Sequence, residues 1–327
     1  MAEVVSRLKK VGLALGTGTF PAAAAAFTRG LFVQSFSSDP SQDVKPVEEI
    51  TGKLLKQRAT RGVIDYKPKL EFALDCGDGY GAHIGDFLAS LLGTETPTNV
   101  GGGVYKHRLS INDTAEPSWL NLWSDKDPVV KQYYGFRPGS CKISLAAKDG
   151  EIKVSVDGVL VGTIDGYGSQ TLAYTDEQIL TAHDATVVTL GGATVTSFEK
   201  MDIEIKRGQE AQHFIGNSRL IGGLRSGKDF SATISFESVV FADETEKNKF
   251  LANTSGNFEL KLVSPSGAYI DFVFGTMMYD KFEGPALKGS DILTQSGASF
   301  ACGLEAALYI DIQNGYGYRY DTGAVIS

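Results

Sequence analysis

Cysteine is scarce in this sequence. Three cysteines occur among 327 residues, and Cys76, Cys141 and Cys302 lie far apart. A small, odd and scattered set of this kind does not form a disulfide framework. We therefore expect all three to be small buried hydrophobic residues of a protein made in a reducing compartment.

Residue patterns for metal and nucleophilic chemistry are also missing. No HExxH motif and no Gly-x-Ser-x-Gly elbow occurs. The glycine-rich residues 12–18 lack both the GxGxxG spacing and a Walker lysine. A Ser-His-Asp arrangement assembled in space stays open, because triads do not depend on sequence order. No pair of histidines has metal-ligand spacing; the four are His83, His107, His183 and His213.

Acidic residues leave two further alternatives. Asp75, Asp78 and Asp86 lie close together between glycines, where calcium binding competes with a solvated loop. Paired carboxylates of a glycosidase are a second alternative, but in an acidic chain such pairs arise by chance. We expect a protein that is not an enzyme and that has no cofactor and no metal.

Long apolar runs and an excess of positive charge are both missing. No run reaches the roughly 20 apolar residues that span a bilayer. Glycines interrupt the apolar stretch at 11–15, so a signal peptide is not expected either. The net charge of −8 argues against tight DNA binding, which usually needs a basic patch. The negative charge does not exclude transient passage of DNA along a surface that repels it. We expect a soluble protein made in the cytoplasm.

Alternation of apolar and polar residues is the dominant pattern. Glycine is abundant, and β-branched and aromatic residues recur in short runs, which favours strands joined by turns. A period of two predicts strands with one buried and one wet face, as in antiparallel sheets. Asp149-Gly150 between two such runs predicts a hairpin turn. The clearest strands are residues 69–74, 151–157, 201–206, 233–237 and 258–262.

Helical periodicity is limited to two short segments. Apolar residues recur at i, i+3, i+4 and i+7 in residues 84–92, and Gly93 follows as the expected stop. Residues 243–251 predict a second helix, which begins with acidic residues as the helix dipole prefers.

The two halves of the chain resemble each other. Arg61, Asp65-Tyr66, Leu70 and Phe72 correspond to Arg225, Asp229-Phe230, Ile234 and Phe236 with a constant offset of 164. The segment 87–93 corresponds to 250–256 with an offset of 163. Turn, strand, loop and helix follow in the same order twice, which predicts a tandem duplication. The alternative is that two β-rich halves share generic patterns.

The duplication predicts a layout of two domains with extended ends. We expect an N-terminal arm, a first β-sandwich domain, a linker or long loop, a second β-sandwich domain and a C-terminal tail. Their ranges are 1–25, 26–165, 166–193, 194–312 and 313–327.

Aromatic residues cluster in two places. Between Trp119 and Phe136 they predict a domain core or a subunit interface, although a carbohydrate-binding platform would have the same composition. At the C-terminus, tyrosines alternate with glycine and arginine, as in an arm that pairs with a neighbour by strand addition. The candidate interface residues are Tyr133, Tyr134, Phe136, Tyr316, Tyr318 and Tyr320.

Several segments resemble the siphophage-type phage tail tube (major tail) proteins, in a two-domain form. The opening at Leu8–Leu13, with the Gly-Thr-rich turn at Gly16–Pro21, is similar to the start of these proteins. The loop that contains Arg61 and the strand Lys69–Leu74 also resemble segments of these proteins. The resemblance continues in the helix that ends at Gly93. Residues 129–136, followed by 141–145 and the hairpin to 156, extend it.

The resemblance implies a mainly β fold of two tandem tube-like β-sandwich domains, each with one short helix, plus extended terminal arms. It implies a structural subunit whose rings stack into a hollow tube, with inner sheets joined into a channel for DNA. The duplication suggests a ring of three chains with pseudo-sixfold symmetry.

The expected partners are copies of the chain and other tail proteins: the tape measure, the terminator and the distal tail protein. DNA is expected only in transit, and no membrane is expected. The protein would be a late product of the host cytoplasm that resides in the virion tail. The alternative function is a β-sandwich phage adhesin or carbohydrate-binding tail component.

Overall fold

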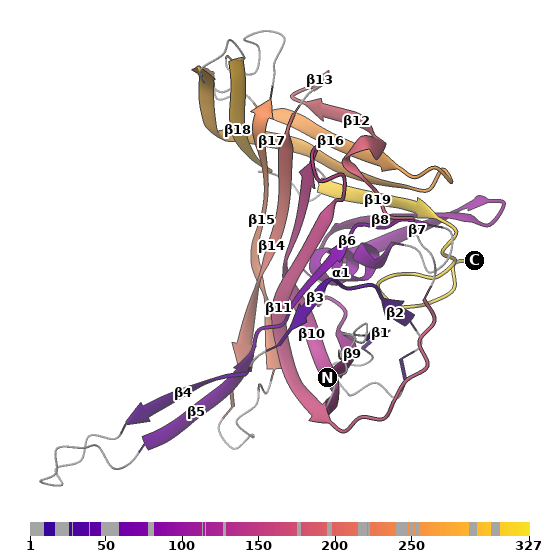
Figure 1. The fold of residues 1–327 in the computed structure, drawn as a ribbon, viewed down its shortest axis with the longest axis vertical. Helices are drawn as coiled ribbons and strands as arrows, with labels where there is room; N and C mark the ends of the chain where they lie inside the picture. The colour runs from indigo at the N-terminus through magenta and orange to yellow at the C-terminus, as the bar shows by residue number, and fades with distance from the viewer. Residues whose placement is uncertain are drawn as a thin grey trace, which may run out of the picture.

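The computed structural model is mainly β, with one regular α-helix among the described residues. The described residues are 10–16, 26–27, 29–38, 40–46, 59–77, 82–112, 114, 116–126, 129–174, 178–194, 198–214, 221, 223–239, 248, 251–252, 255–287, 293–301 and 308–327. Long antiparallel strands dominate, and β14 and β15 run along the longest axis of the molecule (Figure 1).

The first sheet, called sheet 1 below, contains eight strand positions. The first position holds both β3 and β4, and the second holds both β6 and β5. The other six positions hold, in order, β11, β10, β14, β15, β18 and the last part of β17. The strands are β3 (Ser35–Ser37), β4 (Pro40–Pro46), β5 (Ala59–Tyr66), β6 (Lys69–Ala73), β10 (Val129–Ala146), β11 (Lys153–Asp165), β14 (Lys200–Gln212), β15 (Gly223–Val239), β17 (Tyr269–Leu287) and β18 (Leu293–Ala301).

The second sheet, called sheet 2, shares β17 with the first. The first part of β17 pairs with β16 on one side and with β19 on the other, and β19 also pairs with β8. The remaining strands of sheet 2 are β7 (Gly93–Gly101), β8 (Val104–Ile111), β12 (Ala185–Leu190), β13 (Ala193–Thr194), β16 (Gly256–Val263) and β19 (Leu308–Asn314).

Three further strands extend the start of β10. Strand β9 (Leu120–Lys126) pairs with β10 and with β1 (Val11–Leu15), and β1 pairs with β2 (Arg29–Leu31). A single turn of 3-10 helix, η1 (Ala182–Asp184), leads into β12 and has a capping box from Thr181 and Asp184.

Helix α1 (His83–Leu92) lies between the two sheets. It contacts β10 and β14 of sheet 1 and β7 and β8 of sheet 2, and all ten of its residues are buried. The predicted stop is confirmed, because Gly93 adopts the left-handed conformation (φ 97°) and its N–H bonds to the Ala89 carbonyl. The helix is therefore the central filler of a β-sandwich core.

The alternation that predicted the strands also builds the core. On β14, Met201, Ile203 and Ile205 are fully buried, while the residues between them face outward. The five predicted strands are confirmed within β6, β11, β14, β15 and β16, and Gly150 makes the predicted turn with φ 70°. Of the predicted second helix, Asn248 and Leu251 are helical, and the rest lies outside the described residues.

The two halves of the chain share one hydrophobic core. A single cluster of buried residues includes Leu70 and Phe87 from the first half and Phe258 and Phe272 from the second. Strand pairs β10–β14 and β8–β19 also join the halves. The domain boundaries at 26–165 and 194–312 stay a prediction.

Candidate assembly surface

Sheet 1 ends in two open edges. Within the described residues, β3 and β4 pair on one side only, with β6 and β5. In the same part of the chain, the last part of β17 pairs on one side only, with β18. Among the residues that the structure describes, neither edge has a strand on its outer side. An open edge offers unpaired backbone N–H and C=O groups to another chain.

The same sheet contains a finished junction of this kind within the chain. Strand β10 of the first half pairs antiparallel with β14 of the second half over seven residues, from Ser140 opposite Lys206 to Ala146 opposite Lys200. At its centre Ile143 lies opposite Ile203, and both are fully buried. The junction shows how the two halves fit edge to edge.

The open edge at β3 corresponds to β14. Ile203 of β14 pairs with Ile234, and Phe36 of β3 pairs with Leu70. Leu70 and Ile234 are 164 residues apart, which is the offset of the sequence repeat. Phe36 therefore occupies in the first half the position that Ile203 occupies in the second.

The open edge at β17 corresponds to β10 by the same rule. Ile143 pairs with Val154, which pairs with Phe72. In the second half, Phe282 pairs with Gly297, and Gly297 pairs with Phe236. Phe236 lies 164 residues after Phe72, so Phe282 is the counterpart of Ile143. The outer edges of sheet 1 are thus the counterparts of the two strands that already pair at its centre.

An apolar cavity of about 440 Å³ opens beside the β3 edge. Phe32 and Ile179 belong to its lining, and they are 53% and 57% exposed. Apolar surface next to an unpaired strand edge is typical of a protein contact site. The lining residues are Lys10, Leu31, Phe32, Val33, Gln34, Ala73, Glu151, Tyr174 and Ile179.

The outward face of sheet 1 carries ion pairs both between neighbouring strands and along single strands. Asp202 of β14 pairs with Lys142 of β10 at 3.2 Å and with Lys200 of its own strand at 3.7 Å. Lys200 also contacts Glu237 at 3.0 Å. Two further pairs lie along single strands: Lys69–Glu71 at 2.7 Å and Lys206–Glu204 at 2.9 Å.

The pairs shift the pKa values of Lys69, Glu71, Lys200 and Asp202 toward the charged forms. The hydrogen bond from Lys69 lowers the pKa of Glu71, and Glu71 raises the pKa of Lys69. Partial burial opposes the charge on Asp202, but hydrogen bonds from Ser144 and Lys142 outweigh it and lower the pKa. Lys69, Glu71, Lys200 and Asp202 therefore stay charged at neutral pH.

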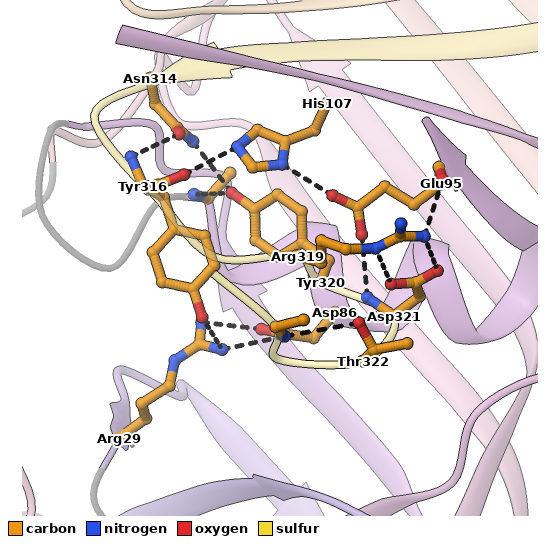
Figure 2. A network of polar contacts seen from close by, with 12 residues as sticks. Arg29, Asp86, Glu95, His107, Asn314, Tyr316, Arg319, Tyr320, Asp321 and Thr322 are labelled. Atoms are coloured by element: carbon orange, nitrogen blue, oxygen red, sulfur yellow. Dashed lines mark hydrogen bonds and ion pairs between the residues drawn. The ribbon is translucent and has the colours of Figure 1, made fainter. Parts of the chain in front are cut away.

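A second, buried polar network ties the C-terminal segment to the core (Figure 2). The Tyr320 hydroxyl accepts hydrogen bonds from the Ala82 N–H at 3.0 Å and from the Asn314 amide at 2.9 Å. His107 contacts the Glu95 carboxylate at 2.8 Å and the Tyr316 carbonyl oxygen at 3.0 Å. The chain after β19 therefore packs against its own helix and sheet 2.

Arg29 of β2 links the N-terminal strands to the same network. Its guanidinium pairs with Asp86 of α1 at 2.8 Å and donates to the Tyr316 hydroxyl at 3.3 Å. Burial opposes the charge on Arg29, but Asp86 and Tyr316 outweigh it and raise its pKa. For Asp86, burial is the largest influence and raises the pKa despite Arg29.

The predicted interface tyrosines mostly lie inside the chain. Tyr316 and Tyr320 are 6% and 0% exposed, and Tyr318 is 49% exposed. Tyr133 and Phe136 are buried in the core, and Tyr134 is half-buried. Their role as an interface stays a prediction, and of the six only Tyr318 is exposed enough to be reached directly.

The aromatic cluster before β10 is also buried. Trp119 and Trp123 are 5% and 1% exposed, which favours the core interpretation over a carbohydrate-binding platform. The Arg137 guanidinium covers the Trp119 ring at 3.6 Å. This packing, like the Arg29–Asp86 pair, has no signature in the sequence.

The acidic residues considered for calcium separate in the structure. Asp86 pairs with Arg29, and Asp75 pairs with His83, while Asp78 lies outside the described residues. No group of three or more potential metal ligands occurs within the described ranges. No helix described in the chain is long and apolar enough to cross a membrane. Cys76 and Cys141 are fully buried, as expected, and Cys302 lies outside the described residues.

Comparison with known protein families supplies the identity. The family model described as phage tail tube protein matches residues 9–302, which is most of the chain. The chain belongs to the phage tail tube protein family. No curated protein matches it.

Membership agrees with the architecture already described. A tail tube protein is a structural component of the virion tail, and the mainly β sandwich and its open edges suit a subunit that contacts its own copies. The resemblance seen in the sequence is confirmed at the level of the family. The siphophage type and the two-domain form stay predictions.

Proposed function

We propose that this tail tube protein forms rings of three chains, in which the sheet 1 of each chain joins the next. The observation that carries the proposal is the pair of open edges on sheet 1, which are the repeat counterparts of the β10–β14 junction. A chain with complementary edges at its two ends polymerises until the ring closes and no edge remains.

The internal junction sets the register of the proposed contact. Because Ile143 lies opposite Ile203, Phe282 of one chain is placed opposite Phe36 of the next. The strand directions agree, since adjacent strands alternate throughout sheet 1, and β17 and β3 would again run antiparallel. Each ring would contain six equivalent junctions, three within chains and three between them.

The size of such a ring suits a channel. Three eight-stranded sheets give about 24 strands spaced ~4.8 Å apart, and hence a backbone diameter of about 37 Å before strand tilt is counted. Barrels of roughly 16 to 18 strands already hold an aqueous channel. Helix α1 and sheet 2 cover one face of sheet 1, so the outward face would line the channel, through which DNA passes.

Rings of one kind that stack head to tail form an open interface, which grows into a tube. At the tube ends this interface would meet other tail proteins, such as the tape measure, the terminator and the distal tail protein. The hairpin of β4 and β5 projects from one end of the sheet (Figure 1), and in the proposed tube it would contact the adjoining ring.

Disulfide trapping tests the proposed register. In a Cys302→Ala background, Ser37→Cys and Lys281→Cys should lie opposite each other between chains, one step from the Phe36–Phe282 pair. Opposed residues are about 4.5–5.5 Å apart, which allows a disulfide. Oxidation should yield covalent dimers and trimers on a denaturing gel, and no larger species from single rings.

Ser37→Cys with Glu283→Cys is the matched control. These positions share a face but are two residues out of register, about 7–8 Å apart, too far for a disulfide. Equal cross-linking in both pairs would refute the register. Electron microscopy of the purified protein tests the function itself. A protein that stays monomeric at high concentration would contradict it, and six separate chains per ring would refute the trimer.

A further inference from the structure

The outward face of sheet 1 is electrically balanced in its central part. The alternating pattern exposes five lysines and five carboxylates there, so its formal charge is zero although the whole chain carries −8. The lysines are Lys69, Lys142, Lys153, Lys200 and Lys206, and the carboxylates are Glu71, Asp157, Asp202, Glu204 and Glu237.

Four of the five lysines are held in ion pairs with carboxylates. Asp202 pairs with Lys142 of the neighbouring strand β10 and with Lys200 of its own strand β14, and Lys200 also contacts Glu237 of β15. Lys69 and Lys206 pair with Glu71 and Glu204. The fifth, Lys153, lies close enough to Glu71 to lower the pKa of that carboxyl.

We propose that this face is a charge-locked wall for duplex DNA: its lysines are occupied by carboxylates and therefore do not bind passing phosphates. The inference rests on the proposed function, because it requires that DNA runs along this face. It differs from a uniformly acidic wall, which would repel DNA, and from a basic wall, which would hold it.

The physical argument concerns the phosphate contacts. DNA affinity for a basic surface comes from lysine and arginine neutralising phosphates and releasing counterions. A lysine already paired with a carboxylate gains little by exchanging it for a phosphate, and the nearby carboxylate repels the phosphate. A balanced lattice therefore presents a surface of low affinity that neither traps the polymer nor adds a large electrostatic barrier.

Asp202→Asn tests the proposal at the carboxylate that pairs with two of the lysines. The change removes the partner of Lys142 and a partner of Lys200 while keeping a side chain of similar size. The purified protein is mixed with a fluorescent DNA duplex, and binding is followed by anisotropy. The wild type should show no binding at about 50 mM salt, and the variant should bind with an affinity that falls at least tenfold by about 200 mM.

Glu259→Gln is the matched control. It makes the same change in net charge, but Glu259 lies on β16 of sheet 2. The proposal is overturned if the wild type binds DNA, if Asp202→Asn does not bind, or if Glu259→Gln binds equally well. Binding is measured on the unassembled chain, in which this face is not enclosed, so the result does not depend on tube formation. Micrographs of the same preparations report on the proposed function separately.

Discussion

Two groups of opposite charges in this protein differ in burial. Around α1, Arg29 and Asp86 pair with only 11% and 0% of their side chains exposed. On sheet 1, Lys200 and Glu237 pair with 40% and 64% exposed. A buried charge is costly unless its partner is present, whereas an exposed pair contributes about 0–1 kcal/mol. The buried pair therefore holds segments together, and the exposed pairs determine what the surface presents.

The largest effect is expected from breaking the buried pair. Asp86→Ala leaves Arg29 charged and without its carboxylate in the core, which should lower the free energy of unfolding by about 3–5 kcal/mol. Chemical denaturation measures the loss. The double variant Arg29→Met/Asp86→Leu serves as the control, because apolar replacements remove both buried charges. A double variant as unstable as Asp86→Ala would contradict this explanation.

A second variant tests how tightly the C-terminal segment packs on the helix. A Cβ atom added at Gly85 would lie 2.6 Å from the Tyr320 ring. Gly85→Ala should therefore destabilise the protein by about 1–3 kcal/mol through overpacking, although alanine normally favours a helix. Thermal unfolding measures the loss. Tyr320→Leu in the same chain should relieve part of it, and additive effects of the two changes would argue against the contact.

Asp271 of β17 lies between the two groups of charges in burial, because it is partly buried and lies near the carboxylate of Glu259. Burial and the charge of Glu259 raise its pKa to about 6. The folded state therefore holds a proton that the unfolded state has already lost between about pH 4 and pH 6. The wild type should lose stability as the pH rises through this window and remain less stable above it.

Asp271→Asn removes this titration. Melting temperatures across the pH range should show the variant more stable than the wild type at pH 7.5, with the advantage shrinking toward pH 4. Asp202→Asn is the contrasting control, since hydrogen bonds from Ser144 and Lys142 outweigh the partial burial of Asp202 and lower its pKa. An Asp271→Asn advantage that does not change with pH would refute the assignment.

The smallest effect is expected on sheet 1. Lys200→Ala removes the ion pairs that this exposed lysine makes with Asp202 and Glu237, and it should change the free energy of unfolding by less than about 1 kcal/mol. Urea denaturation in low and high salt measures it, and salt should reduce the difference further. A loss as large as that of Asp86→Ala would mean that the exposed pairs also hold the fold together.

Much of the secondary structure could be predicted from local pattern. Alternation placed strands at 69–74 and 201–206, and the i, i+3, i+4 spacing placed α1 and its stop at Gly93. These predictions succeed because a strand or helix with one buried face needs apolar residues at the matching period. The constant offset of 164 residues also proved useful, since it relates the paired and open strands of sheet 1.

The candidate site was harder to predict. The sequence pattern predicts that Tyr316 and Tyr320 belong to an extended arm, yet both are buried and take part in the chain's own polar network. Tyrosines spaced by glycine are compatible both with an exposed arm and with a buried segment, because their burial depends on which other parts of the chain pack around them. The pairing of Arg29 with Asp86, 57 residues apart, has no local signal either.

The sequence alone determined the positions of five strands and of α1, the acidic net charge and the family of this protein, because those properties reside in local periodicity, composition and motif. Only the tertiary structure decided that β10 of one half pairs with β14 of the other, that matching edges stay open at β3 and β17, and that lysines and carboxylates meet across strands. Strand order and cross-strand contacts join residues far apart in the chain, so they are set by how whole sheets pack around α1.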